Sequence, residues 1–177
     1  MTYTPDAIAN FFIGLPAAQS SLTPMKIQKL VYFAHGWHLA LKDAPLLNES
    51  IQAWEFGPVV ERLYHALKEH GDSPVTEPIV RLKVRPGMIS SNGIEEYAPS
   101  LEDEPESKTF TKALLEKVWA IYGKFNAIQL SKMTHDEGTP WDQIRKQFPT
   151  FLLKGVPIPN EVIRLYFKAK LPVQSAT

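Results

Sequence analysis

The clearest pattern of apolar positions lies between Thr23 and Leu41, where hydrophobic residues recur at the three- and four-residue spacing of an α-helix. Thr23 and Pro24 mark its start, because a threonine hydroxyl can cap the first turn and proline suits the first helical position. One apolar face is formed by Ile27, Leu30, Val31, Ala34, Trp37, His38 and Leu41. The side chains expected to be in water are Lys26, Gln28 and Lys29. A helix that is apolar on nearly all sides is buried, so residues 24–41 are predicted to form a central helix about 28 Å long.

Shorter helices are predicted elsewhere from the same spacing and from residues that favour helix ends. The first begins at Thr4-Pro5 and ends at Gly14. Asn126 with Gln129 resembles a capping box at the start of another. The remaining helices are expected from Gly57-Pro58 to about His70, from Lys108 to Lys124, from Ala127 to Met133, from Thr139-Pro140 onward and after Asn160, which would cap the last one.

Strand signals are confined to residues 46–56 and 79–98. The first region alternates so that Gln52, Trp54 and Phe56 share one side. In the second region Val80, Leu82 and Val84 alternate with the basic residues Arg81, Lys83 and Arg85. Asn92-Gly93 is a favourable hairpin turn, and the strands that it would join are Met88–Ser91 and Ile94–Tyr97.

The predicted class is therefore mainly α: a single helical domain around a long buried central helix (about 24–41), with a small β element around 46–56 and 79–98. Prolines exclude a long helix from 72–107, and the acidic run Glu102 to Glu106 is expected to be a mobile loop. The expected boundaries are 1–170 for the domain, 72–107 for a variable insertion within it and 171–177 for a flexible tail.

Composition narrows the classes of function. Lys plus Arg and Asp plus Glu both number 19, which gives a formal net charge of zero, whereas a dedicated nucleic-acid binder usually carries a basic excess. The absence of cysteine excludes disulfides, thiol catalysis and cysteine-ligated zinc. The N-terminal residues lack a signal-peptide pattern and no apolar run reaches the length of a membrane span, so we expect a cytoplasmic protein without a membrane partner.

Three segments together carry a family resemblance. They are T-P-M-K-I-Q-K-L-V-Y-F-A-H-G-W (23–37), W-E-F-G-P-V-V-E-R-L-Y (54–64) and L-S-K-M-T-H-D-E-G-T-P-W (130–141). In this order and spacing the chain resembles the Panacea domain, the SocA-like antitoxin family of phage-associated proteins, over most of residues 4–168. The resemblance implies an antitoxin that is encoded beside a toxin gene and neutralises that cognate protein toxin, usually by direct binding. The family's signature positions would be Lys26, Lys29, Tyr32, Trp54, Gly57, Pro58, His135 and Trp141.

Two of these clusters admit more than one interpretation. Lys26 and Lys29 lie one turn apart and can contact an acidic group on a partner, or can be exposed lysines whose stems cover apolar neighbours. An internal carboxylate would offset their unfavourable position at a helix N-terminus. Trp54 and Phe56 stand beside a sharp turn and can anchor a partner or fill the core, and the core role is favoured.

Two other function classes remain open as alternatives. A small metal-dependent hydrolase could use His35, His38 and His135, but a zinc site needs three or four convergent ligands. The sequence contains no nucleophile elbow and no glycine-rich phosphate loop, so neither an enzyme nor a cofactor is expected. A DNA-binding autorepressor could use 24–41 as its second helix, but a recognition helix shows a polar face, and nucleic acid is not an expected partner.

The expected partner is a cognate protein toxin, and residues 72–107 are the segment most suited to meet it. This segment is charged and poorly periodic, and exposed strands can pair with an extended partner. Arg81, Lys83 and Arg85 are the candidate partner-binding residues. A solvated insertion without a binding role is the alternative.

Overall fold

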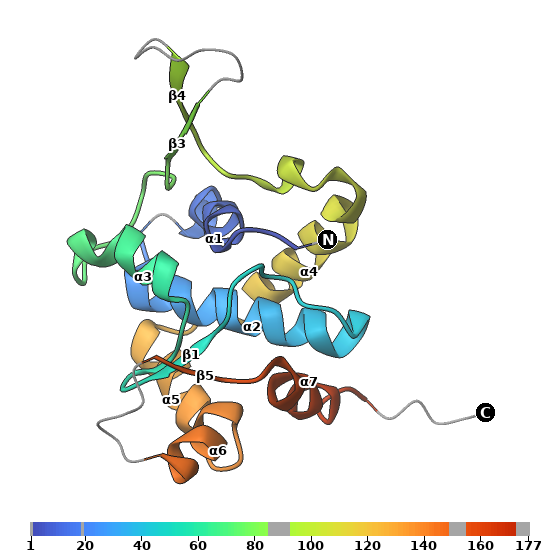
Figure 1. Cartoon of the computed structure of the whole chain (residues 1–177). Coiled ribbons are helices and arrows are strands. Elements are labelled where there is room, and N and C mark those ends of the chain that lie inside the picture. Colours follow the sequence, from blue (N-terminus) through green and yellow to red (C-terminus); the bar gives the residue numbers. More distant parts are fainter. Residues whose placement is uncertain (1, 19, 85–92, 149–154, 173–177) are drawn as a thin grey trace.

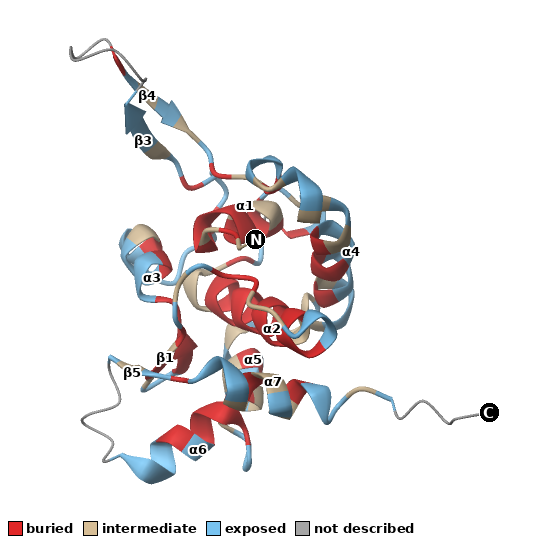
Figure 2. Cartoon of the chain, turned by 45° about the vertical axis from the view of Figure 1, so that its right-hand side comes forward, coloured by how far each residue is buried: buried red, intermediate tan, exposed pale blue. Residues whose placement is uncertain are grey.

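The central element of the fold is α2 (Pro24–Lys42), which crosses the middle of the molecule among the other helices (Figure 1). Thr23 caps it as predicted, and its hydroxyl accepts a hydrogen bond from the Lys26 amide at 3.4 Å. Most side chains of α2 are buried (Figure 2), which confirms the prediction of a buried central helix. The computed structural model describes residues 2–18, 20–84, 93–148 and 155–172.

Helices surround α2 on several sides, and capping side chains explain where three of them begin. At three helix starts a side-chain oxygen accepts a hydrogen bond from a backbone amide of the first turn; the residues are Thr4, Asn126 and Thr139. The last helix has no side-chain cap, because Pro159 and not Asn160 precedes its first turn, so the prediction that Asn160 caps it is wrong. The predicted capping box is complete, with both Asn126–Gln129 bonds at 2.9 Å. The helices that pack on α2 are α1 (Pro5–Ile13), α3 (Glu61–Leu67), α4 (Pro105–Tyr122), α5 (Ala127–His135) and α7 (Asn160–Lys168), while α6 (Pro140–Gln147) lies against α5 and α7.

Two small antiparallel sheets are present among the described residues. In the first, β1 (Gln52–Trp54) lies between β2 (Gly57–Val59) and β5 (Val156–Pro157). In the second, β3 (Arg81–Val84) pairs with β4 (Ile94–Tyr97), and the pair projects away from the helices (Figures 1 and 2). We call β3 and β4 together the hairpin arm. The mainly α class with a small β part is confirmed.

Aromatic packing joins α2 to α4 and α7. The Phe33 ring stacks on Tyr122 with centroids 4.1 Å apart and the planes at 5°. Phe167 of α7 is 1% exposed and lies edge-on to Trp37, with centroids 5.1 Å apart. A Cβ added at Gly36 would lie 2.2 Å from the Phe167 ring. The close approach of α7 to α2 therefore depends on a glycine.

The three polar residues at the start of α2 are buried, so the expectation that they are in water is wrong. The exposed fractions are 3% for Lys26, 5% for Gln28 and 1% for Lys29. Other segments cover this turn and supply acceptors that periodicity cannot reveal; the Lys26 ammonium, for example, donates to the Gly123 carbonyl at 2.8 Å. Conversely Leu41, expected on the apolar face, is 48% exposed.

The segment after the first β-turn is a strand and not the start of a helix. Gly57–Val59 pairs with β1, and α3 begins only at Glu61. Gly57 has φ +100°, a conformation that favours glycine and reverses the chain where a helix was expected. The alternation therefore breaks before Phe56, which is 62% exposed and does not share the environment of half-buried Gln52.

The predicted insertion, residues 72–107, contains more regular secondary structure than expected among its described residues. Both strands of the arm fall inside the predicted 79–98 region, whereas the predicted strand Met88–Ser91 lies outside the described residues. The acidic run forms the 3₁₀ turn η4 (Leu101–Asp103) and the first turn of α4, and is not a loop. Carboxylates at a helix start are favoured by the helix dipole. Most of the predicted flexible tail, 171–177, lies outside the described residues.

Candidate functional site

Several signature residues converge on the turn between β1 and β2, residues 54–57, which we call the clamped turn. Side chains of α5 and α6 lie within hydrogen-bond distance of three consecutive carbonyl oxygens of this turn. The bonds join Trp141 Nε1 to Trp54 O (2.7 Å) and Ser131 Oγ to Phe56 O (3.0 Å). The His135 ring lies between two carbonyl oxygens, with Nε2 3.1 Å from Glu55 O and Nδ1 2.6 Å from Ser131 O, and it donates to Glu55 O in the tautomer that carries the proton on Nε2. The His135 ring also packs on Trp141, with centroids 3.9 Å apart. A turn with three consecutive acceptors engaged by side chains is held in one shape.

Buried polar residues of α2 hold the strand that follows the turn. Lys29 Nζ donates to the Pro58 carbonyl at 3.1 Å. The Gln28 side-chain amide bonds both the N–H and the carbonyl of Val60, each at 3.0 Å. Burial lowers the pKa of Lys29 from 10.5 to about 7, because the charged form loses its hydration. Among the described residues the hydrogen-bond partner of Lys29 is a backbone carbonyl, and not an internal carboxylate that would offset its position at the helix N-terminus.

Gly57 lets these groups approach the backbone. A Cβ added at its positive φ of +100° would lie 2.6 Å from Thr134 Oγ1 and 2.7 Å from Lys29 Nζ. A side chain at this position would therefore displace the groups that hold the turn. Lys29, Gly57 and Pro58 thus share one structural task with the donors on α5 and α6.

Lys26 and Tyr32 lie outside the clamped turn. Lys26 donates to Gly123 at the end of α4 and lies 5.3 Å over the Trp119 ring, and burial lowers its pKa. Tyr32 packs edge-on to Phe167 at 5.8 Å, and burial raises the pKa of its phenol. These two signature residues tie α2 to α4 and α7.

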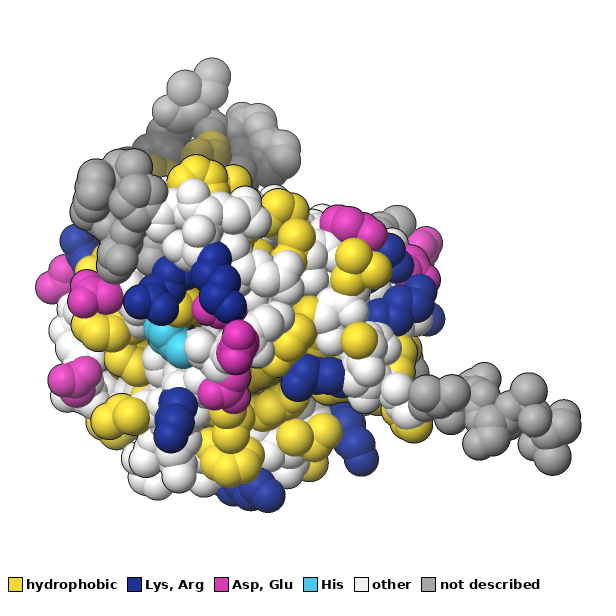
Figure 3. Space-filling model, turned by 90° about the horizontal axis from the view of Figure 1, so that it is seen from below, with side chains coloured by type: hydrophobic (Ala, Val, Ile, Leu, Met, Phe, Trp, Pro, Cys, Tyr) yellow, Lys and Arg dark blue, Asp and Glu magenta, His cyan; other side chains and the backbone are white. Residues whose placement is uncertain are grey.

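Although the backbone of the clamped turn is fixed by residues of α5 and α6, some side chains in and around the turn are exposed to solvent. Phe56 is 62% exposed, so its assignment to the core is wrong. Trp54 is half-buried, with its ring 4.8 Å from that of Tyr64, so it does not fill the core completely. On α5, Ile128 is 76% exposed. The molecule seen from below also shows apolar side chains in the open among charged ones (Figure 3).

The histidines considered as metal ligands have separate structural partners. His35 Nε2 donates to Asn160 Oδ1 at 2.9 Å, its Nδ1 accepts the Leu47 amide at 3.3 Å, and burial lowers its pKa to about 4. His38 Nδ1 donates to the Ala44 carbonyl at 2.8 Å. The third histidine belongs to the clamped turn. Within the described ranges, no group of three or more His, Asp or Glu side chains is placed to hold a metal ion.

The basic residues predicted to bind a partner are engaged within the chain. Arg81 donates to both carboxylate oxygens of fully buried Asp6, at 2.8 and 3.1 Å, and this bonding holds the pKa of Arg81 above its usual value. Lys83 pairs with Glu95 across the arm at 2.9 Å. Arg85 lies outside the described residues. Partner binding by these three side chains stays a prediction, and Arg81 already has a role at the base of the arm.

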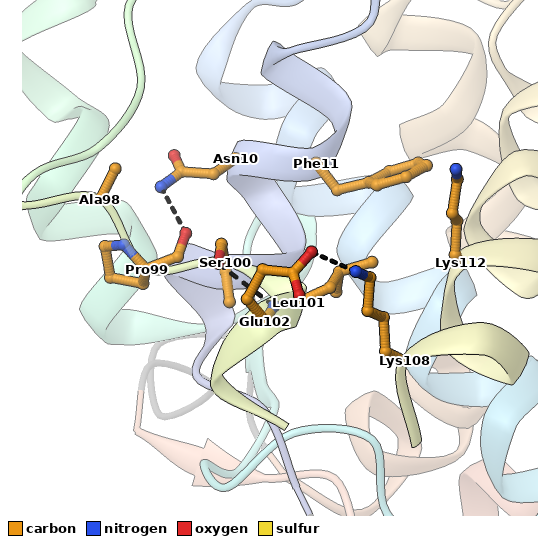
Figure 4. A pocket seen from close by; sticks show the side chains of 10 residues that line it. Asn10, Phe11, Ala98, Pro99, Ser100, Leu101, Glu102, Lys108 and Lys112 are labelled. Carbon is orange, nitrogen blue, oxygen red and sulfur yellow. Dashed lines mark hydrogen bonds and ion pairs between the residues drawn. The ribbon is translucent and has the colours of Figure 1, made fainter. Parts of the chain in front are cut away.

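Asn10 of α1 fixes the root of the arm. Its Nδ2 donates to the carbonyls of Ile79 and Pro99, each at 2.9 Å, and its Oδ1 accepts the Ile79 amide at 2.7 Å. Beside Pro99 lies a pocket of about 370 Å³ between α1, residues 98–102 and the start of α4 (Figure 4). Phe11 forms part of its wall, and no histidine lines it.

Sequence reasoning missed four residues that position these features: Gln28, Ser131, Asn10 and Asp6. Gln28 carried a usable signal, because it is a polar residue within an apolar helix and needs a buried partner. Asp6 carried none, because the helix dipole is sufficient to explain a carboxylate in the first turn of a helix. Asn10 and Ser131 carried no such signal, since polar residues on short helices are usually exposed.

DNA binding by α2 and membrane insertion would each require a particular feature of the described part of the chain. α2 is buried, so it does not present a face to the edges of DNA bases. No described helix combines the length and apolar character needed to cross a membrane.

The fold and site define a class of mainly helical protein in which a β-turn is clamped against a buried central helix. The chain belongs to the family described as "Antitoxin SocA-like, Panacea domain", whose model matches residues 27–142 and so spans the clamp from Lys29 to Trp141. The chain is 31% identical over 163 residues to the protein named Antitoxin SocA of Caulobacter vibrioides (strain NA1000 / CB15N). The aligned residues cover 92% of this chain and 81% of that protein. No solved structure matches the chain significantly.

Proposed function

We infer that this protein is an antitoxin that neutralises a cognate protein toxin by binding it directly, without catalysis. The observation that carries this proposal is the 31% identity, over 92% of the chain, to the protein named Antitoxin SocA. The partner is then a protein toxin, which the proposal places with this chain in the cytoplasm. The family does not identify the toxin.

The geometry of the signature residues supports a binding role. Lys29, His135 and Trp141 donate to backbone carbonyls, so their polar groups are used to shape the chain. The result is a preformed turn that holds Phe56 62% exposed. A rigid surface loses less entropy on binding, and exposed aromatic side chains are frequent anchors at protein interfaces.

The test is a rescue experiment with the protein encoded by the gene beside this one, because antitoxins of this family are expected next to their toxin. Expression of the neighbouring protein alone should arrest growth, and co-expression of this chain should restore growth. The purified proteins should also elute together in size-exclusion chromatography. Rescue without a complex would contradict direct binding, and failure of both would contradict the antitoxin role.

Stoichiometry separates binding from catalysis. A binding antitoxin neutralises the toxin fully only near molar equivalence, whereas an enzyme acts at far lower ratios. His38→Asn is a matched variant, because its side-chain amide can replace the Nδ1–H donor to Ala44. We expect this variant to rescue as well as the parent. Loss of rescue by a folded His38→Asn variant would instead favour the hydrolase alternative.

A further inference from the structure

The hairpin arm has one apolar face that the described residues leave uncovered. Directly opposed residues of an antiparallel pair share a face, so Leu82, Val84 and Ile94 stand on one side of the arm. Their exposed fractions are 67%, 66% and 52%, and Val80 just before β3 is 50% exposed. We call these four residues the apolar arm face. Glu96, opposite Leu82, lies on the same side.

The other face of the arm is charged, but its described charges are satisfied internally. Lys83 pairs with Glu95 at 2.9 Å and also lies 5.1 Å over the Tyr97 ring. Arg81 is held by buried Asp6. A partner gains little from charges that are already paired. The apolar face is therefore the side on which the arm can gain most by contact.

The arm is also held ready for contact. The hydrogen bonds of Asn10 fix the chain at both ends of the arm, before β3 and after β4. The Arg81–Asp6 pair fixes the first residue of β3 on α1. Two-stranded hairpins are only marginally stable in water, so these root contacts stabilise a projection that could not hold itself.

The size of the arm decides what kind of occupant fits. Its described residues, four in each strand, give a face about 13 Å long and about 10 Å wide, which is on the order of 130 Å². A stable interface buries about 800 Å² on each partner. Two copies stacked through this flat face fall far short of that area. The occupant must therefore enclose the arm in a concave apolar groove and reach the body of the protein beyond it.

The pocket at the foot of the arm supplies the additional area. It begins at Ala98, directly after β4, and Phe11 and Leu101 form apolar parts of its wall (Figure 4). Two lysines stand at this pocket. Lys108 is paired with Glu102, whereas Lys112 has Glu116 only at 4.0 Å. An apolar side chain beside a carboxylate on the occupant would complement this pocket.

We propose that the apolar arm face and the pocket at its foot form a docking surface for the toxin, separate from the exposed Phe56 of the clamped turn. The toxin receives the arm in an apolar groove and places a carboxylate near Lys112. This proposal rests on the proposed antitoxin function. The sequence pattern predicted partner binding by the basic side of the arm, whereas this proposal assigns toxin binding to the opposite, apolar side. Val80, Leu82, Val84 and Ile94 are exposed, so they can be changed with little effect on folding.

The experiment measures the dissociation constant for the protein encoded by the neighbouring gene, with the full-length chain and its variants. Leu82→Ser/Val84→Ser should raise that constant roughly 25-fold, because a residue at the centre of an interface that loses about 1 kcal/mol on truncation weakens binding about fivefold, and the two factors multiply. Leu165→Ser is the matched control, since Leu165 is also apolar and 55% exposed but lies on α7. Lys83→Ser tests the charged face on the same strand. Both controls should bind like the parent, and Lys112→Glu should weaken binding.

Each contrary result has a distinct meaning. Unchanged binding by the folded Leu82→Ser/Val84→Ser variant overturns the docking surface but leaves the antitoxin function intact. An equal loss of toxin affinity in Leu165→Ser also overturns it, because the effect is then a non-specific one of removing exposed apolar side chains. An equal loss in Lys83→Ser overturns it in favour of the charged face. If the parent chain is a dimer in solution and only Leu82→Ser/Val84→Ser is a monomer, the occupant of the arm face is a second copy of this chain, and the proposal is overturned. Absence of binding by the parent contradicts the proposed function itself.

Discussion

Lys29 gives the sharpest test of how the centre of the fold is built. It is 1% exposed, and burial lowers its pKa to about 7 from 10.5. Between these two values the unfolded chain binds more protons than the folded chain, so the free energy of unfolding must rise with pH. Each pKa unit corresponds to about 1.4 kcal/mol, so the full penalty below pH 7 is on the order of 5 kcal/mol. The penalty disappears as pH rises towards 10.5.

Lys29→Met removes the titrating group while keeping much of the volume. The variant loses the hydrogen bond to Pro58, which costs about 1 kcal/mol. It also loses the burial penalty, so at pH 6 to 7 we expect it to be more stable than the parent. From pH 7 to pH 9 that advantage should shrink by about 2–3 kcal/mol, because only the parent gains stability over this interval.

Urea unfolding at several pH values, followed by tryptophan fluorescence, measures this difference by linear extrapolation. Other titrating groups are common to both proteins and cancel in the comparison. Lys132→Met is the control, because Lys132 is exposed on α5 and its removal should leave the slope of the parent unchanged. Parallel pH profiles for Lys29→Met and the parent would refute the reasoning.

Three further substitutions test close packing and anchoring. Gly57→Ala should destabilise the protein by about 2 kcal/mol or more in thermal unfolding, because the added Cβ meets Thr134 and Lys29 at a positive φ; a melting temperature equal to that of the parent would contradict the close fit. Gly36→Ala should cost about 1–3 kcal/mol by forcing the Phe167 ring aside, and near-ultraviolet circular dichroism should report the loss of aromatic packing. Asn10→Ala should speed amide hydrogen exchange in β3 and β4 far more than in α2, and uniform acceleration would show that Asn10 does not act on the arm in particular.

Local signals in the sequence predicted the helices well. Thr23-Pro24, Asn126 with Gln129, and Thr139-Pro140 each combine a capping side chain with a helix-favouring neighbour, and each marks an observed start. These signals act within one turn of backbone, so the sequence alone is sufficient to read them.

The errors arose where distant segments decide the environment. Lys29 looks exposed by periodicity, but the strand after the clamped turn covers it and accepts its hydrogen bond. Arg81 looks available on a basic strip, but Asp6, far away along the chain, accepts two hydrogen bonds from its guanidinium group. Gly57 was read with Pro58 as a helix start, although its positive φ serves a β-turn. Such roles depend on tertiary contacts that no local window contains.

The most direct test of the central claim is calorimetric titration of this chain into the purified protein encoded by the neighbouring gene. The proposal predicts saturable binding near one molar equivalent, with an enthalpy that becomes more negative as temperature rises, because apolar surface such as the arm face is buried. Two folded proteins that give no saturable binding at any temperature tested would contradict an antitoxin that acts by direct contact.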